Sequence, residues 1–347
     1  MNAPIAIAHR PSTEWRELVD EDEGARFEGY AKRFAEVQRA RAKAGKLDRA
    51  LHAKSHAGVL AELEVLGDLP EHARHGLFTT PRTYRAYVRF SPGNGVHQHD
   101  RRGDVRGLAV KVVGVDGRKL IPGMEDARTQ DFLLIQTRAT PFRDAHQFVD
   151  VALAAVSPLT QLPRVGWKHG VGTLAGWLRA FVAGTKPIGS LAELTFWAPP
   201  PIRLGPYAVR YSARPHAPVA PSSAPKDRDG LGLDLAERLA KGPIVYDLRL
   251  QFFVDEARTP IEDHSAEWPD DVAPHVTVAT LRIPQQDLRS ERGRKIHEYV
   301  DTLSFDPWHA REDMRPLGSM NRARKAAYRE SVIARSAAKE PDGSEAW

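Results

Sequence analysis

Hydrophobic and polar residues alternate with a period of two in several parts of this chain. In residues 84–93, Arg89 and Ser91 fall on one face of an extended chain, and Val88 and Phe90 fall on the other. The segment is rich in aromatic and β-branched residues and ends in a Pro-Gly pair, so it predicts a β-strand. Similar patterns predict strands at residues 104–113, 129–135, 194–197, 207–211, 244–254 and 276–283. Asp116-Gly117 predicts a hairpin turn after the 104–113 strand.

Helical spacing marks both ends of the chain. Residues 13–46 carry apolar side chains three and four positions apart, which predicts an amphipathic helix packed on the body of the protein. Residues 319–335 are rich in Ala, Arg, Lys and Glu and contain no Gly or Pro, and Ser319 or Asn321 can cap their start, so a second helix is expected. Apolar runs between residues 143 and 185 are broken by Pro and Gly, which predicts two short helices and a loop.

The predicted elements define the fold class and the domain organisation. Several alternating strands, joined by long loops and flanked by helices, predict an α+β protein with a large antiparallel sheet or closed barrel. We expect an N-terminal helical extension over residues 1–45, a single domain over residues 46–337, and a flexible tail over residues 338–347. The Pro- and Ser-rich residues 215–225 are expected to form an exposed loop.

Composition narrows the function classes. The 347 residues include no Cys, which excludes disulfides, thiolate metal sites and cysteine nucleophiles. The net charge of +5 is spread among interleaved acidic residues, so it is weak support for binding nucleic acid or a membrane surface, and we expect no nucleic-acid partner. No stretch has the pattern of a signal peptide or the length of a membrane span, so the expected location is cytoplasmic.

The C-terminal helix carries the first candidate chemistry. At about 3.6 residues per turn, Arg324, Tyr328, Ser331 and Arg335 share one stripe. A fixed positive charge beside a phenol favours the phenolate and lowers the pKa of the phenol, and a phenolate is a hard ligand suited to ferric iron. The alternative for this stripe alone is a solvated basic helix with one tyrosine packed beneath it.

Two further segments carry polar residues that could form a site. Arg89 and Ser91, on one face of their strand, could line a cavity that holds an anion, or could simply form an exposed polar face. Residues 48–58 contain His52 and His56, and a lone histidine is more often a hydrogen-bonded structural residue than a catalyst.

Four motifs, taken together and in order, resemble the haem catalase superfamily in its short, catalase-related form. They are Arg49-Ala50-Leu51-His52-Ala53-Lys54, Val88-Arg89-Phe90-Ser91, Asp104-Val105-Arg106-Gly107-Leu108-Ala109-Val110-Lys111, and Arg324-Lys325-Ala326-Ala327-Tyr328 followed by Arg335. The resemblance extends from about residue 45 to residue 337. It implies an antiparallel β-barrel of about eight strands with flanking helices.

The resemblance also implies a cofactor, haem b, and a role for each matched residue. Tyr328 would be the axial ligand of the iron, as in the catalase case of tyrosine ligation, and Arg324 would hold it as phenolate. Arg49, Arg89 and Arg335 would pair with the haem propionates, and Phe142 would contact the haem. His52 would act as general acid and base on bound hydrogen peroxide, oriented by Ser91. Thr129, or a neighbour, stands where the family has a distal Asn.

The implied function is a haem-dependent, catalase-related peroxidase that reduces hydrogen peroxide or organic peroxides with an organic electron donor. The change at Thr129, the Leu194 that replaces a supporting His, and the absence of the long arm and helical domain of large catalases predict slow catalatic turnover. The alternative is a fatty-acid hydroperoxide isomerase of the allene oxide synthase type, where Thr commonly precedes the distal His. Here Leu51 precedes His52, which favours peroxide reduction. A non-catalytic haem carrier would not need His52 with Ser91, and a homodimer is left open.

Overall fold

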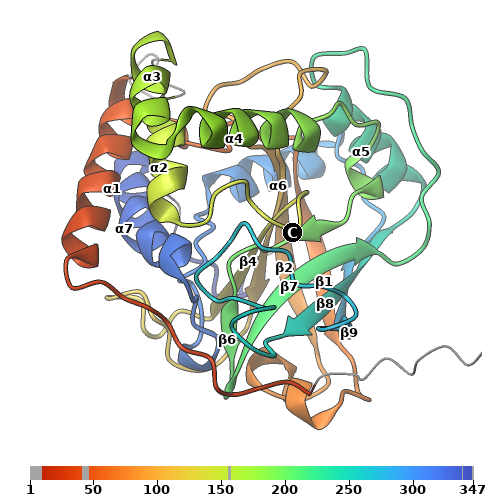
Figure 1. The fold of residues 1–347 in the computed structure, drawn as a ribbon. Coiled ribbons are helices and arrows are strands. Elements are labelled where there is room, and N and C mark those ends of the chain that lie inside the picture. Colours follow the sequence, from red (N-terminus) through yellow and green to blue (C-terminus); the bar gives the residue numbers. More distant parts are fainter. Residues whose placement is uncertain (1–9, 41–46, 155–157, 338, 346–347) are drawn as a thin grey trace, which may run out of the picture.

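The computed structural model describes residues 10–40, 47–154, 158–337 and 339–345. The strands within these residues are β1 Ala57–Val65, β2 Thr83–Pro92, β3 Arg106–Val113, β4 Thr129–Ile135, β5 Phe196–Trp197, β6 Ile202–Leu204, β7 Tyr207–Pro215, β8 Ile244–Phe252 and β9 Val276–Ile283. They pair antiparallel in the order β5-β4-β3-β2-β1-β9-β8-β7-β6, and β5 also pairs with β7. Eight strands therefore close into a barrel, with β6 added at β7, which confirms the predicted fold class (Figure 1).

Alternation along the strands builds the barrel core. Val59, Val88 and Val110 are direct partners across three neighbouring strands, and all three are buried. Phe90 and Leu108 continue this inward-facing set one pair further along. The residues that alternate with these side chains point to the outer face of the barrel. Water or another layer of the protein must cover that face.

Helices pack around the barrel. They are α1 Glu23–Ala40, α2 Ala145–Ala154, α3 Pro158–His169, α4 Val171–Gly184, α5 Gly230–Lys241, α6 Glu291–Thr302 and α7 Ser319–Arg335. In Figure 1, α1 and α7 lie side by side on one flank of the barrel, and α2, α3 and α4 extend across one end. Short 3₁₀ turns at Glu71–Ala73, Gly76–Phe78, Leu191–Glu193 and Glu312–Met314 complete the described elements.

Several element predictions differ from the structure. The N-terminal helix begins at Glu23 and not near residue 13, and the predicted end of this helix, residues 41–46, lies outside the described residues. Three helices, not two, occupy the region of residues 143–185. Strands β3 and β4 pair as neighbours, but residues 114–128 join them, so Asp116-Gly117 is not a tight hairpin turn. Helices α5 and α6 were not predicted.

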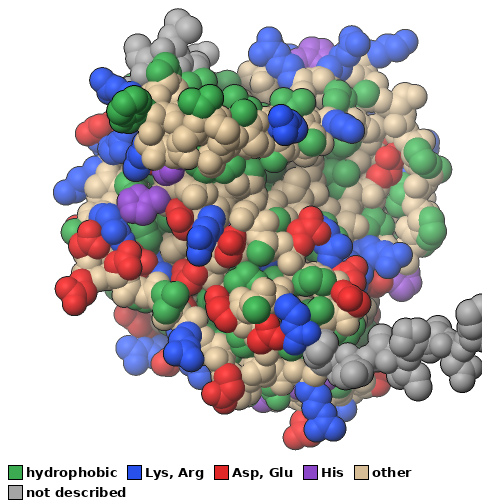
Figure 2. Space-filling view, in the orientation of Figure 1, with side chains coloured by type: hydrophobic (Ala, Val, Ile, Leu, Met, Phe, Trp, Pro, Cys, Tyr) green, Lys and Arg blue, Asp and Glu red, His purple; other side chains and the backbone are tan. Residues whose placement is uncertain are grey.

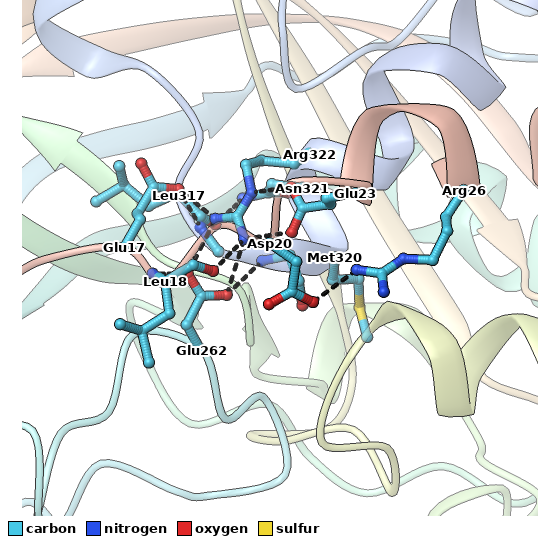
Figure 3. A network of polar contacts seen from close by, with 12 residues as sticks. Glu17, Leu18, Asp20, Glu23, Arg26, Glu262, Leu317, Met320, Asn321 and Arg322 are labelled. Atoms are coloured by element: carbon cyan, nitrogen blue, oxygen red, sulfur yellow. Dashed lines mark hydrogen bonds and ion pairs between the residues drawn. The ribbon is translucent and has the colours of Figure 1, made fainter. Parts of the chain in front are cut away.

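A cluster of ion pairs fixes the start of α7. Arg322 donates to Glu17 and Glu23, each at 2.6 Å, and to Glu262 at 2.9 Å. The carboxylates of Glu17 and Glu262 also accept the backbone N–H groups of Gly318 and Ser319, at 2.9 and 2.7 Å. Figure 3 shows Arg322 between these three glutamates. Acidic groups at the positive end of a helix dipole are stabilising, so the orientation of α7 is held at its N-terminus.

The chain beyond α7 returns to the barrel. The sequence predicts a flexible tail from residue 338, whereas Glu340 lies buried against the outer face of β3 and β4. Its carboxylate accepts hydrogen bonds from Lys111 at 2.7 Å, Thr129 at 2.7 Å and Ser304 at 3.0 Å. Lys111 is fully buried and also bonds Asp131, and a buried ammonium requires such partners. Glu340 therefore attaches the tail to the barrel.

None of the helices within the described ranges is long and apolar enough to cross a membrane.

Candidate functional site

A cavity of about 880 Å³ lies between the outer face of β2–β4 and the layer formed by α1, α2, α4 and α7. This volume is within the range of about 300–1,000 Å³ that small-molecule and cofactor sites occupy. Eight of the nine predicted site residues line it: Arg49, His52, Arg89, Ser91, Phe142, Arg324, Tyr328 and Arg335. The structure thus brings together residues that lie as far apart as 49 and 335 in the chain.

Strand register sets the barrel wall of the cavity. Ser91 on β2 pairs with Gly107 on β3, and Gly107 pairs with Ile135 on β4. A Cβ atom at Gly107 would come within 2.8 Å of His52 Cε1 and 3.2 Å of Ser91 Oγ. A glycine inside a strand often marks such a close approach, and here it provides the space that the imidazole ring occupies.

His52 is held by its backbone as well as by its ring. Its φ of 55° is in the left-handed region. Its N–H donates to the carbonyl of Gly93 at 3.0 Å, and its own carbonyl accepts from Arg89 at 3.1 Å. The ring Nδ1 lies 3.0 Å from Ser91 Oγ. Burial, together with the positive charges of Arg89 and Arg324, lowers the pKa of His52 to about 3, so the imidazole is neutral near pH 7.

Three guanidinium groups gather at one edge of the cavity around one carboxylate. Arg49 Nη1 and Arg89 Nε contact the same oxygen of Asp301, at 3.1 and 2.9 Å. Arg335 has a buried Nε with no hydrogen-bond partner among the described residues. Burial and then the charge of Arg89 lower the pKa of both Arg49 and Arg335. Asp301, together with the charge of Asp48 acting on Arg89 and Arg335, offsets only part of these three positive charges, and the remaining positive charge suits a ligand with anionic groups.

The opposite wall carries Tyr328 and Arg324 on α7. Arg324 Nη1 donates to Asn321 Oδ1 at 3.3 Å. Burial raises the pKa of Tyr328, and the charge of Arg324 offsets this only in part. The predicted lowering of the Tyr328 pKa is therefore wrong for the protein alone, because the cost of burying a phenolate exceeds the attraction of one guanidinium. A further cation at the phenol oxygen would be needed to favour the phenolate.

Aromatic side chains close the cavity at the side of α2 and α4. The ring of Phe142 packs edge-on against Trp177, with centroids 5.5 Å apart, and against Phe148 at 5.8 Å. Phe181 on α4 also faces the cavity. This part of the cavity is apolar and can accept a flat or hydrocarbon group.

Two residues considered from the sequence, Thr129 and His56, do not line the cavity. Thr129 does not line the cavity, and its hydroxyl donates to Glu340 instead, so its predicted catalytic position is not supported by this geometry. His56 is buried near Asp100 and is also outside the cavity. Sequence reasoning missed Gly107, which the pattern of a glycine within a strand could have indicated, and Asp301, which lies at the end of an unpredicted helix.

Comparison with known proteins agrees with this fold. No family model matches the chain. A catalase-related peroxidase of Mycolicibacterium paratuberculosis is 28% identical over 256 residues, covering 72% of this chain and 77% of that protein. Among solved structures, a fungal catalase superposes with a TM-score of 0.65 at 17% identity over 99% of this chain, and catalase A from Saccharomyces cerevisiae with a TM-score of 0.65 at 16% identity over 96%.

The chain spans 67% and 68% of the length of these two catalases. At such low identity the superpositions establish the fold, while the sequence match adds a distant relative. The resemblance read from the four motifs is therefore confirmed: this chain has the catalase fold and is distantly similar to a catalase-related peroxidase.

Proposed function

We propose that this protein is a haem-dependent oxidoreductase that reduces hydrogen peroxide or an organic peroxide with an organic electron donor. The observation that carries the proposal is the cavity in which His52 and Ser91 on one wall face Tyr328 and Arg324 on the other. The similarity to a protein named catalase-related peroxidase supports the same reaction class.

The cavity residues fit haem b. Its two propionates would balance the surplus positive charge of Arg49, Arg89 and Arg335, and would give the unpartnered Arg335 Nε an acceptor. Tyr328 would provide the phenolate ligand, since ferric iron adds the positive charge that Arg324 alone does not supply. The aromatic wall at Phe142 and Trp177 would contact the apolar rim of the macrocycle.

When bound, haem would supply an iron centre that coordinates peroxide and accepts oxidising equivalents. His52 would do the proton transfer. With Nδ1 donating to Ser91 Oγ, Nε2 is the free acceptor, and a neutral ring can take a proton from one peroxide oxygen and return it to the other as the O–O bond breaks. In the overall reaction, the donor supplies two electrons and two protons to one peroxide. An organic peroxide gives an alcohol and water, and hydrogen peroxide gives two waters.

The experiment that tests the proposal is reconstitution with haem b. The parent protein should give a ferric spectrum of the phenolate-ligated type, and Tyr328→Phe should lose it. Tyr30→Phe is the matched control, because Tyr30 lines the same cavity from α1 and not from α7. A Tyr328→Phe protein with the parent spectrum would contradict the proposal.

Fatty-acid hydroperoxide isomerisation is the second candidate. The apolar part of the cavity, near Phe142 and Phe181, would accept a hydrocarbon chain, which favours it. Against it stands Leu51 in place of a Thr before His52. We expect the reconstituted protein to turn over hydrogen peroxide with an aromatic donor faster than it rearranges a polyunsaturated fatty-acid hydroperoxide. Stopped-flow rates with product identification decide between them, and faster formation of an allene oxide would favour the isomerase.

A further inference from the structure

Helix α4 presents a second apolar face, directed away from the protein. Val171, Ala175, Leu178 and Val182 recur at i, i+4, i+7 and i+11, the spacing of one helical stripe, and all four are exposed. The exposed fractions of Val171, Leu178 and Val182 are 77%, 46% and 69%. The other face of α4 packs inward through the buried Trp177. A stripe with this spacing normally marks a buried face.

Trp167 at the end of α3 extends the apolar surface. Its side chain is 93% exposed, the largest such value among the exposed large hydrophobic residues described. We call Trp167, Val171, Ala175, Leu178 and Val182 the outer patch. In Figure 2 hydrophobic side chains gather over α3 and α4 along one edge of the molecule. Exposed apolar side chains gathered on one surface mark an interaction site.

The charge around the outer patch has one sign. The 42 residues from 151 to 192 contain no Asp or Glu. Lys168 in this interval pairs with Asp150 just before it, at 2.6 Å. Arg164, Arg179 and Lys186 are exposed, and no ion pair is found for them within the described ranges. The even spread of charge inferred from the whole sequence therefore hides a local cationic region.

We propose that the outer patch docks on the surface of an anionic lipid bilayer, with α4 lying in the interface. Tryptophan and aliphatic residues on one face and Arg and Lys beside it are the signature of an interfacial helix. A second copy of the chain fits less well, because a symmetric contact through this patch would bring its cations against the same cations. Since Phe181 of α4 lines the cavity, docking would set the cavity beside the lipid.

Co-sedimentation with vesicles tests the proposal, with the full chain and without peroxide, so its outcome is independent of the proposed reaction. The protein should bind vesicles of phosphatidylglycerol and phosphatidylcholine, bind phosphatidylcholine alone far more weakly, and dissociate as salt is raised. Replacing Arg164, Arg179 and Lys186 together by Gln should weaken binding about a hundredfold.

Two double variants separate the patch from general surface hydrophobicity. Leu178→Ser with Val182→Ser should weaken binding at least about tenfold. The matched control is Leu233→Ser with Leu18→Ser. Leu233 and Leu18 lie on other parts of the surface and are 43% and 65% exposed, close to the 46% and 69% of Leu178 and Val182. All four positions are exposed, so neither double variant should change the melting temperature of the protein. An unchanged melting temperature serves as the control that both variants are folded.

Three outcomes would overturn the proposal. One is no binding of the parent protein to anionic vesicles, and another is equal binding by the two double variants. The third is a dimer in analytical ultracentrifugation that becomes a monomer in the Leu178→Ser, Val182→Ser variant without any vesicle binding, which would assign the outer patch to a second copy.

Discussion

His52 adopts a backbone conformation that residues with a Cβ atom rarely adopt. A non-glycine residue in the left-handed region costs on the order of 1–3 kcal/mol, and such residues are concentrated at functional sites. Here the hydrogen bond to Gly93 and the contact from Arg89 hold the backbone, while Ser91 and the open space at Gly107 hold the ring. The result is an imidazole fixed in a cavity, which a purely structural histidine would not require.

Replacing His52 tests whether this arrangement is catalytic. The haem-loaded His52→Ala protein should keep its cofactor, because Tyr328 is unchanged, but should react with peroxide about 10²- to 10⁴-fold more slowly, the range general acid–base catalysis supplies. Ser91→Ala removes only the orienting hydrogen bond, on the order of 1 kcal/mol, and should lose about five- to tenfold. Stopped-flow absorbance measures both rates.

A non-catalytic haem carrier would show no loss in either variant. If His52→Ala reacted with peroxide at the parent rate, the acid–base role of His52 would be wrong. His56, the other histidine in the segment, could not easily replace it, because it lies outside the cavity and is buried near Asp100.

The positions of the candidate residues were predictable where a motif tied them together. The motif around His52 and the strand with Ser91 were identified from the sequence, and the structure brings both to the cavity. Thr129 was assigned by its place at a strand start, but strand pairing puts it opposite Val113, at the far end from the Gly107–Ile135 pair beside His52. Register across strands is a long-range property that a local motif does not contain.

At the scale of elements, strands were predicted better than helices. A period of two survives in β2, β3 and β4 because one face of each strand is in the barrel core. Helix α6 was missed because its buried positions are few, with Ile296 and Val300 one turn apart in a charged segment. Helix α5 begins in Gly-rich sequence, which resembles a loop.

The chain beyond α7 shows that a polar segment can be held against the body of the protein. Its Pro, Asp, Gly and Ser content is typical of a frayed end, yet Glu340 supplies a second carboxylate to the buried Lys111. Lys111 was identified as part of a strand, but its burial and its need for acidic partners follow only from the packing of β3 against the chain beyond α7. One of its two acidic partners, Glu340, lies more than 200 residues away.

At the scale of the molecule, the site depends on two long-range contacts. Closure of the barrel through β5 and β7 fixes the curvature of the wall at β2–β4, and packing of α1 on α7 brings the two ends of the chain to one cavity. The sequence predicts each partner separately, since alternation and helical spacing are local. The distance between the barrel wall and the helices is set by tertiary packing, and a local sequence pattern does not predict it.

The same packing buries several histidines, and their titration gives a prediction for the whole fold. Burial lowers the pKa of His52 and His309 to about 3, and of His56 and His264 well below the ordinary value. The unfolded chain, with histidine pKa values of about 6.5, takes up protons below that pH that the folded protein does not bind. These four groups therefore stabilise the fold fully above about pH 6.5 and lose this contribution as the pH falls.

Asp306 and Asp131 act in the opposite direction, because burial raises the pKa of Asp306 to about 7 and that of Asp131 well above its ordinary value, so the folded protein binds their protons first. Two such carboxyls do not cancel the four histidines, because burial also lowers the pKa of His275 and His297. The free energy of unfolding should therefore fall as the pH is lowered from 7 to 5. Urea unfolding at pH 7, 6 and 5 measures it. His309→Gln should have a shallower dependence on pH than the parent protein, because it removes one of the buried histidines. A free energy of unfolding that is constant or rises over this range would mean that these histidines are accessible to protons in the folded state.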